Sequence, residues 1–153
     1  MPAKMVDITG KSETYREAIA TGLIKLKRET LELIKKGAIE KGDVLTVSTV
    51  ATINAVKLTP HVLPLTHNIP VTGVNVEFKF EEDGIRVYVS VKTTAKTGVE
   101  MEALLGALVA LLNVWDMVKK YEKDETGQYP HTAITDVRVL KKVKGGAIVE
   151  GDH

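Results

Sequence analysis

The stretch VNVEFKFEEDGIRVYVSV, residues 74–91, carries the clearest structural pattern in this chain. Apolar side chains occupy every second position, at 74, 76, 78 and 80 and again at 85, 87, 89 and 91. This alternation predicts two half-buried strands, and the Asp83-Gly84 pair between them is typical of a tight primed turn. One apolar face per strand predicts a sheet that helices cover on one side.

A strand, two helices and a loop are expected before this hairpin. Alternation at residues 24–27 favours a strand over 16–27 rather than a helix. A short helix follows over 29–36. The uncharged run over 44–56 is long and contains alanines, which predicts a buried helix rather than a strand. Residues 59–70 hold three prolines, so we expect a fixed loop without regular structure.

A long helix and a last strand are expected after the hairpin. Thr97 and Glu100 have the spacing of a capping box, which predicts a helix from Thr97 to about residue 121. A strand over 135–143 then precedes a glycine-rich tail. The order strand, helix, helix, strand, strand, helix, strand predicts an α+β fold. We expect a two-layer, ferredoxin-like sandwich whose antiparallel sheet is covered on one face by helices.

Length and composition narrow the class of protein. The 153 residues suit one domain, 1–153, with flexible ends at about 1–12 and 144–153. The absence of cysteine excludes a disulfide scaffold, a thiolate metal site and a cysteine nucleophile. A net charge of +1 argues against a general nucleic-acid partner. The N-terminus lacks the apolar core of a signal peptide, and the uncharged run 103–115 is too short for a bilayer, so we expect a cytoplasmic protein without membrane contact.

Two histidines lie in the proline-rich segment. His61 and His67 have an ordinary interpretation as solvated or hydrogen-bonded loop residues. A loop fixed by prolines is also well suited to holding an imidazole in a defined geometry. Their spacing matches no standard zinc motif, so we predict no protein metal site.

Carboxylates and lysines supply the other candidates. Glu100 is explained by helix capping, whereas Glu102 faces about 200° away and is not. Asp116 and Lys119 have the spacing of a helical surface ion pair, although Asp116 directly follows the apolar run. Lys41 precedes a helix start, where a cation is electrostatically misplaced and hints at an anionic ligand. Lys57 has a plain interpretation as a surface residue near a helix end.

Several segments together resemble the molybdenum cofactor biosynthesis protein C family, the cyclic pyranopterin monophosphate synthases. They are KGDV at 41–44, AVK at 55–57, LPLTH at 63–67, KTGVEMEAL at 96–104 and DMVK at 116–119. The resemblance covers nearly the whole chain. It implies a ferredoxin-like homohexamer, a trimer of dimers. It also implies a lyase that converts 3′,8-cyclo-7,8-dihydroguanosine 5′-triphosphate into cyclic pyranopterin monophosphate and pyrophosphate, on the way to a molybdenum or tungsten cofactor.

The resemblance also implies roles for particular residues. Its catalytic positions fall on Lys41, His67, Asp116 and Lys119. Its substrate-binding positions fall on Leu65, Thr66, His67, Glu100, Met101, Glu102 and Lys57. The family's usual Cys-His-Pro is Thr66-His67-Asn68 here, which removes any thiol role but leaves the imidazole. No resident cofactor is implied, although Mg²⁺ can accompany the triphosphate.

Two other classes of function remain open from the residues alone. One is a non-catalytic nucleotide sensor whose lysines only bind phosphate. The other is a metal-dependent hydrolase that uses both histidines and both glutamates. If the synthase interpretation holds, Glu102 and Asp116 are roughly 21 Å apart along one helix. We therefore expect a site at a dimer interface, with an isologous partner supplying one of the two ends. The apolar run 103–115, with Gly106 and Ala110 allowing close approach, fits such an interface.

Overall fold

The computed structural model describes residues 1–148 of the chain. The strands are β1 (Thr14–Lys25), β2 (Val71–Glu81), β3 (Gly84–Ala95), β4 (Ala133–Lys144) and β5 (Ala147–Ile148). The helices are α1 (Arg28–Lys36), α2 (Val44–Lys57), α3 (Thr59–Val62) and α4 (Glu100–Glu122). The expected order of elements is therefore confirmed, with α3 and β5 as additions. Residues 149–153 of the expected glycine-rich tail lie outside the described part.

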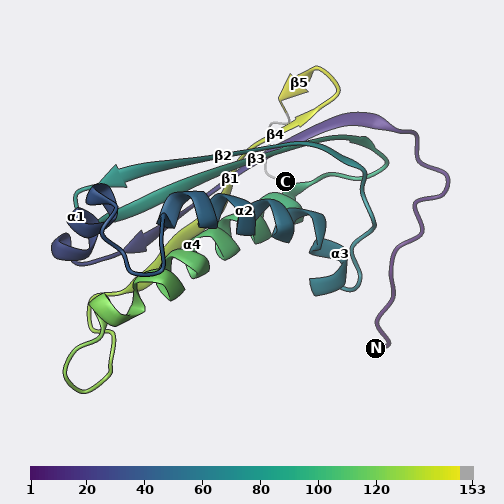
Figure 1. The fold of residues 1–153 in the computed structure, drawn as a ribbon. Coiled ribbons are helices and arrows are strands. Elements are labelled where there is room, and N and C mark those ends of the chain that lie inside the picture. Colours follow the sequence, from purple (N-terminus) through teal and green to yellow (C-terminus); the bar gives the residue numbers. More distant parts are fainter. Residues whose placement is uncertain (149–153) are drawn as a thin grey trace.

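The strands form one antiparallel sheet in the order β2-β3-β1-β4-β5. The four long strands thus have the arrangement of a ferredoxin-like sandwich, as predicted. The helices lie on one face of this sheet, and within residues 1–148 none lies on the opposite face (Figure 1). The core fills the space between the layers, where Ile85, Val87, Val89 and Val91 of β3 are completely buried.

The turn of the β2–β3 hairpin differs from the prediction. Glu81 pairs with Gly84, so the two loop residues are Glu82 and Asp83 rather than Asp83 and Gly84. Neither loop residue has a positive φ, and the turn is therefore not a primed one. Gly84 is needed for another reason: a Cβ there would lie 2.2 Å from the carbonyl oxygen of Ile24 on β1.

Helix α4 is the central helix of the sandwich, and α2 lies beside it (Figure 1). The two run antiparallel, because Asn113 donates to Ser48 Oγ at 2.9 Å while Gly106 faces Val56. Gly106 thus admits α2 and β3 of the same chain, which corrects the expectation that it admits a partner. By length and apolar composition α4 could cross a bilayer, yet half of that window is buried inside the fold, as in a core helix.

Two predictions about local structure are wrong, one on the start of α4 and one on the segment 59–70. Val99 is the N-cap of α4 and makes no side-chain capping bond, so Thr97 and Glu100 form no capping box. The segment 59–70 is not wholly irregular, because α3 begins at Thr59 with Pro60 in its first turn. Proline is tolerated there, since the first amides of a helix have no partner to lose. Asp43, by contrast, caps α2, because its side chain accepts a hydrogen bond from Thr46 N at 3.2 Å.

Candidate active site

Three of the predicted catalytic residues meet at the C-terminal half of α4. The ammonium of Lys41 lies 3.0 Å from Oδ2 of Asp116 and donates to the Asp116 backbone oxygen at 3.1 Å. The ammonium of Lys119, one turn along the helix, lies 3.3 Å from Oδ1 of the same carboxylate. We call Lys41, Asp116 and Lys119 the lysine–aspartate cluster. All three side chains are about half exposed and accessible to a ligand.

The fold holds Lys41 in place although it lies between two helices. The preceding residues are anchored: Ile39 is buried in the core, and the Glu40 amide donates to the Tyr121 hydroxyl at 2.9 Å. Hydrogen bonds from both lysines, first from Lys41 and then from Lys119, hold the pKa of Asp116 below its ordinary value. Asp116 is therefore a persistent anion between two ammonium groups.

The glutamates lie at the opposite end of α4, where Glu100, Met101 and Glu102 form what we call the glutamate end. Glu100 pairs with Lys142 of β4 at 2.6 Å, instead of capping the helix. Met101 is exposed, whereas Glu102 is only 3% exposed. Burial is the main cause that raises the pKa of Glu102, and the negative charge of Glu100 adds to it.

The remaining predicted binding residues also lie toward the glutamate end. Lys57 is exposed on the last turn of α2, which runs antiparallel to α4. His67 lines a cavity of about 400 Å³ together with Lys96, a few residues before α4. The Nε2 of His67 lies 2.6 Å from the Val6 carbonyl oxygen. Leu65 is exposed, and the Thr66 hydroxyl donates to the Leu63 carbonyl at 2.8 Å.

Within one chain the predicted site residues are thus brought together as two groups, not one. The 14 positions from Glu102 to Asp116 correspond to roughly 21 Å along the helix axis. His61 is exposed on α3 and belongs to neither group. In residues 1–148, no three histidine, aspartate or glutamate side chains are grouped so that they could hold a metal ion.

Two basic residues near the glutamate end were not found from the sequence. Lys142 reaches Glu100 because it pairs with Ala18 and so shares the helix-covered face of the sheet. Arg16 lies on β1 two positions before Ala18. Its Nε is buried and has no hydrogen-bond partner in the described part of the chain. Only the register of β1 against β4 reveals this placement, and a single sequence does not give that register.

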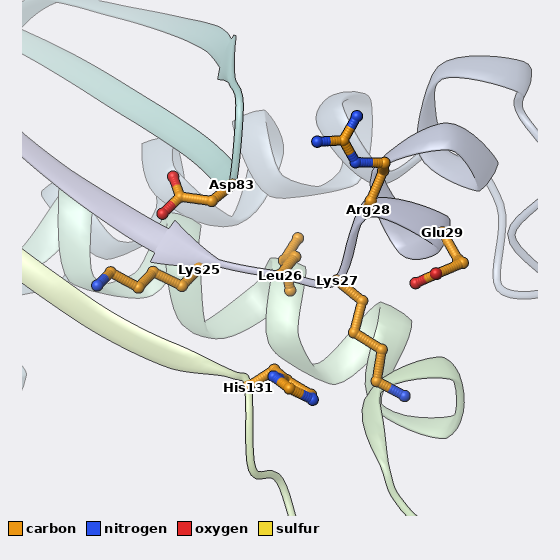
Figure 2. Close-up of a pocket in the computed structure, with 7 residues that line it drawn as sticks. All are labelled: Lys25, Leu26, Lys27, Arg28, Glu29, Asp83 and His131. Carbon is orange, nitrogen blue, oxygen red and sulfur yellow. The ribbon is translucent and has the colours of Figure 1, made fainter.

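A cavity that is larger than those beside the candidate site residues lies elsewhere, at the junction of β1 and α1. It measures about 700 Å³ and is lined by Lys25, Leu26, Lys27, Arg28, Glu29, Asp83 and His131. Lys27 and Arg28 extend in opposite directions from it, so its charged groups do not converge on one point (Figure 2). None of the predicted site residues lines it.

Comparisons with known proteins agree with the resemblance seen in the sequence. Residues 5–145 match the model of the MoaC family. A protein of Aeropyrum pernix named probable cyclic pyranopterin monophosphate synthase is 59% identical over 94% of this chain and 98% of its own length. Two further relatives carry the same name. The protein of Sulfurisphaera tokodaii is 56% identical over 93% of this chain and 94% of its own length. The protein of Pyrococcus horikoshii is 57% identical over 92% of this chain and 89% of its own length. The chain belongs to the MoaC family.

Proposed function

We infer that this protein is a cyclic pyranopterin monophosphate synthase, a lyase of molybdenum cofactor biosynthesis. Family membership over residues 5–145 and the names of relatives at 53–59% identity support this activity. The substrate is 3′,8-cyclo-7,8-dihydroguanosine 5′-triphosphate, and the products are cyclic pyranopterin monophosphate and pyrophosphate. The structural observation that carries the proposal is the Asp116 carboxylate held between the ammonium groups of Lys41 and Lys119.

This cluster suits both halves of the reaction. Rebuilding the guanine-derived imidazole ring as a pyrazine needs repeated proton transfers, which ammonium and carboxylate groups within hydrogen-bond reach can perform. Closing the cyclic phosphate joins a substrate hydroxyl oxygen to the α-phosphorus, while the bond from that phosphorus to pyrophosphate breaks. Negative charge then develops on phosphate oxygens, and Lys41 and Lys119 can stabilise it.

The glutamate end supplies groups of a different character. Glu102 is buried and its raised pKa lets it keep a proton at a higher pH than an exposed glutamate does. A protonated carboxyl can donate a hydrogen bond or a proton to a ring nitrogen or oxygen. His67 is a further proton-transfer group. In this proposal the residues that contact the substrate also include Leu65, Thr66, Lys57, Glu100 and Met101.

The separation of the two groups supports a shared site. We propose that two copies pack their α4 helices antiparallel about a two-fold axis near Leu108 and Val109, midway between Glu102 and Asp116. Leu108 and Leu112 present apolar side chains to solvent there, with Leu112 61% exposed. Such a dimer sets the glutamate end of one copy opposite the lysine–aspartate cluster of the other.

The assembly and its surroundings complete the proposal. Three such dimers form the hexamer, and the protein acts in the cytoplasm on a small-molecule substrate. The chemistry as proposed needs no resident cofactor, and any Mg²⁺ enters with the triphosphate as part of the substrate.

Incubation of the protein with the cyclised GTP substrate tests this function. Cyclic pyranopterin monophosphate and pyrophosphate are expected in equal amounts. A sensor would instead bind the cyclised nucleotide and release it unchanged, and that result would reject the synthase. Activity that persists in the presence of a chelator is expected as well, and it would separate the synthase from a metal-dependent hydrolase.

A further inference from the structure

An apolar cavity of about 340 Å³ lies directly beside the lysine–aspartate cluster. Leu112, Trp115 and Ile134 form its apolar lining, and Asp116 and Lys119 contribute the charged part. This volume is near the lower end of the roughly 300–1,000 Å³ that is usual for small-molecule sites. A mostly apolar wall with a few polar groups at one side is also the usual lining of such a site.

We propose that this cavity binds the fused bicyclic base of the substrate and that the indole of Trp115 stacks on the planar pyrimidinone half of that base. The inference rests on the proposed function, because it names the part of that substrate which the cavity receives. It assigns Trp115 a role in ring binding and in specificity for a base with a planar conjugated half.

The surroundings of Trp115 favour a stacking role. The ring of Tyr129 meets the indole edge-on, with centroids 5.2 Å apart and planes at 69°, so the indole is held by a neighbour rather than free to rotate. A fixed aromatic surface loses little entropy when a ligand ring packs against it. Aromatic residues make up 5% of the chain, and Trp115 is its single tryptophan.

The position of the cavity fits the chemistry. Asp116 and Lys119 line the same cavity as the indole, so a ring that stacks there lies beside the groups proposed to move protons. Two other cavities suit a ring less well. The one at the junction of β1 and α1 and the neighbouring one at Glu82 and Asp83 are lined mainly by charged side chains.

The proposed dimer would close this cavity from the open side. With α4 antiparallel to its copy about Val109, position 116 lies opposite Glu102 of the partner subunit, and Met101 of the partner subunit is one position further along. The ring would then be held between Trp115 of one copy and the glutamate end of the other.

Tryptophan fluorescence tests ring binding without any need for turnover. The probes are GTP, which carries a fused ring, and inorganic tripolyphosphate, which carries the phosphates alone. Excitation at the red edge of the indole band avoids absorption by the purine. We expect saturable quenching by GTP and none by tripolyphosphate. Equal quenching by both probes would place the phosphates rather than the ring near Trp115, and no quenching by either would also overturn the proposal.

Three variants test the role in the reaction. Trp115→Leu keeps an apolar side chain and should raise KM about 5- to 150-fold, since base–aromatic stacking contributes roughly 1–3 kcal/mol. Trp115→Phe keeps an aromatic face and should recover most of this loss, which a merely structural role would not predict for a smaller ring. Tyr88→Leu, on the sheet face away from the helices, is the control and should leave KM unchanged.

The outcomes separate this proposal from the proposed function. Turnover by the wild type, with neither ring-dependent quenching nor a change of KM in Trp115→Leu, would overturn the ring site and leave the synthase intact. Ring-dependent quenching without any product would reject the synthase and support the ring site. Calorimetric titration with GTP then measures binding affinity directly. Trp115→Leu should raise the Kd, and Trp115→Phe should bring the Kd most of the way back to the wild-type value.

Discussion

Lys41 and Asp116 are 75 positions apart in the chain, yet the lysine ammonium lies 3.0 Å from the aspartate Oδ2. The first residue belongs to the connection between α1 and α2 and the second to α4, so only the packed fold brings them together. Lys119 approaches the other carboxylate oxygen. This arrangement of one anion between two cations is the basis of the following predictions.

Removing either lysine should remove most product formation. We expect Lys41→Ala and Lys119→Ala each to lower kcat about a hundredfold or more, as the loss of a proton-transfer and charge-stabilising group does. The thermal midpoint should hardly change, because both side chains are about half exposed and such ion pairs stabilise little. Pyrophosphate release and thermal unfolding measure the two effects. Lys36→Ala, exposed on α1, is the control, and near-normal turnover in either variant would remove that lysine from the mechanism.

The two histidines should behave differently. His67 lies at the cavity with Lys96, whereas His61 is exposed on α3. We expect His67→Ala to lower kcat about a hundredfold or more, as the loss of an acid–base group does, and His61→Ala to have little effect. Steady-state kinetics on both variants decides this. Equal losses would mean that the loop matters and the imidazole does not.

The buried Glu102 should make stability depend on pH. Its pKa is raised in the folded protein, mainly by burial, so the folded state binds the proton more tightly than the unfolded state does. The contribution of Glu102 to the free energy of unfolding is therefore fully present at a pH below its pKa in the unfolded state. This contribution is lost as the pH rises through its pKa in the folded state. Glu102→Gln should abolish this loss, and denaturant unfolding across that pH range measures it. A variant with the same pH dependence as the wild type would show that Glu102 is not the group responsible.

The completely buried Glu122 should be important for stability rather than for catalysis. Its carboxylate accepts from Lys27 N at 3.1 Å, from the Thr30 hydroxyl and from the Thr132 hydroxyl at 2.6 Å. It thereby caps the start of α1, where Lys27 provides no side-chain cap. Glu122→Ala leaves these donors without an acceptor and should cost about 3 kcal/mol of unfolding free energy. Glu125→Ala, an exposed neighbour, is the control, and equal stability of the two variants would contradict this role.

Much of the fold follows from short-range patterns in the sequence. The alternation over residues 74–91 predicts the β2–β3 hairpin correctly, and the apolar run 103–115 marks the buried helix α4. The spacing of Asp116 and Lys119 also predicts their ion pair, because the two residues are neighbours within one turn of a helix. These features need no knowledge of tertiary structure.

The features that the sequence alone did not reveal depend on distant contacts. Glu100 looks like a capping residue from its spacing to Thr97, but Lys142 on β4 offers it a charged partner instead. Glu122 looks like one more surface charge until Lys27, Thr30 and Thr132 surround it. The approach of Lys41 to Asp116 likewise requires the packing of two elements that no local pattern relates.

Mixing two inactive variants tests most directly the central claim, a synthase site built from both ends of α4 in different copies. Glu102→Gln disables the glutamate end, and Lys119→Ala disables the lysine–aspartate cluster. After subunit exchange of equal amounts has been demonstrated, half of the dimers are mixed, and one of the two pockets in each mixed dimer carries both intact residues. About a quarter of all pockets should therefore be active. Recovery of product formation to about that level is the predicted result. Complete exchange without any recovery would contradict the shared site.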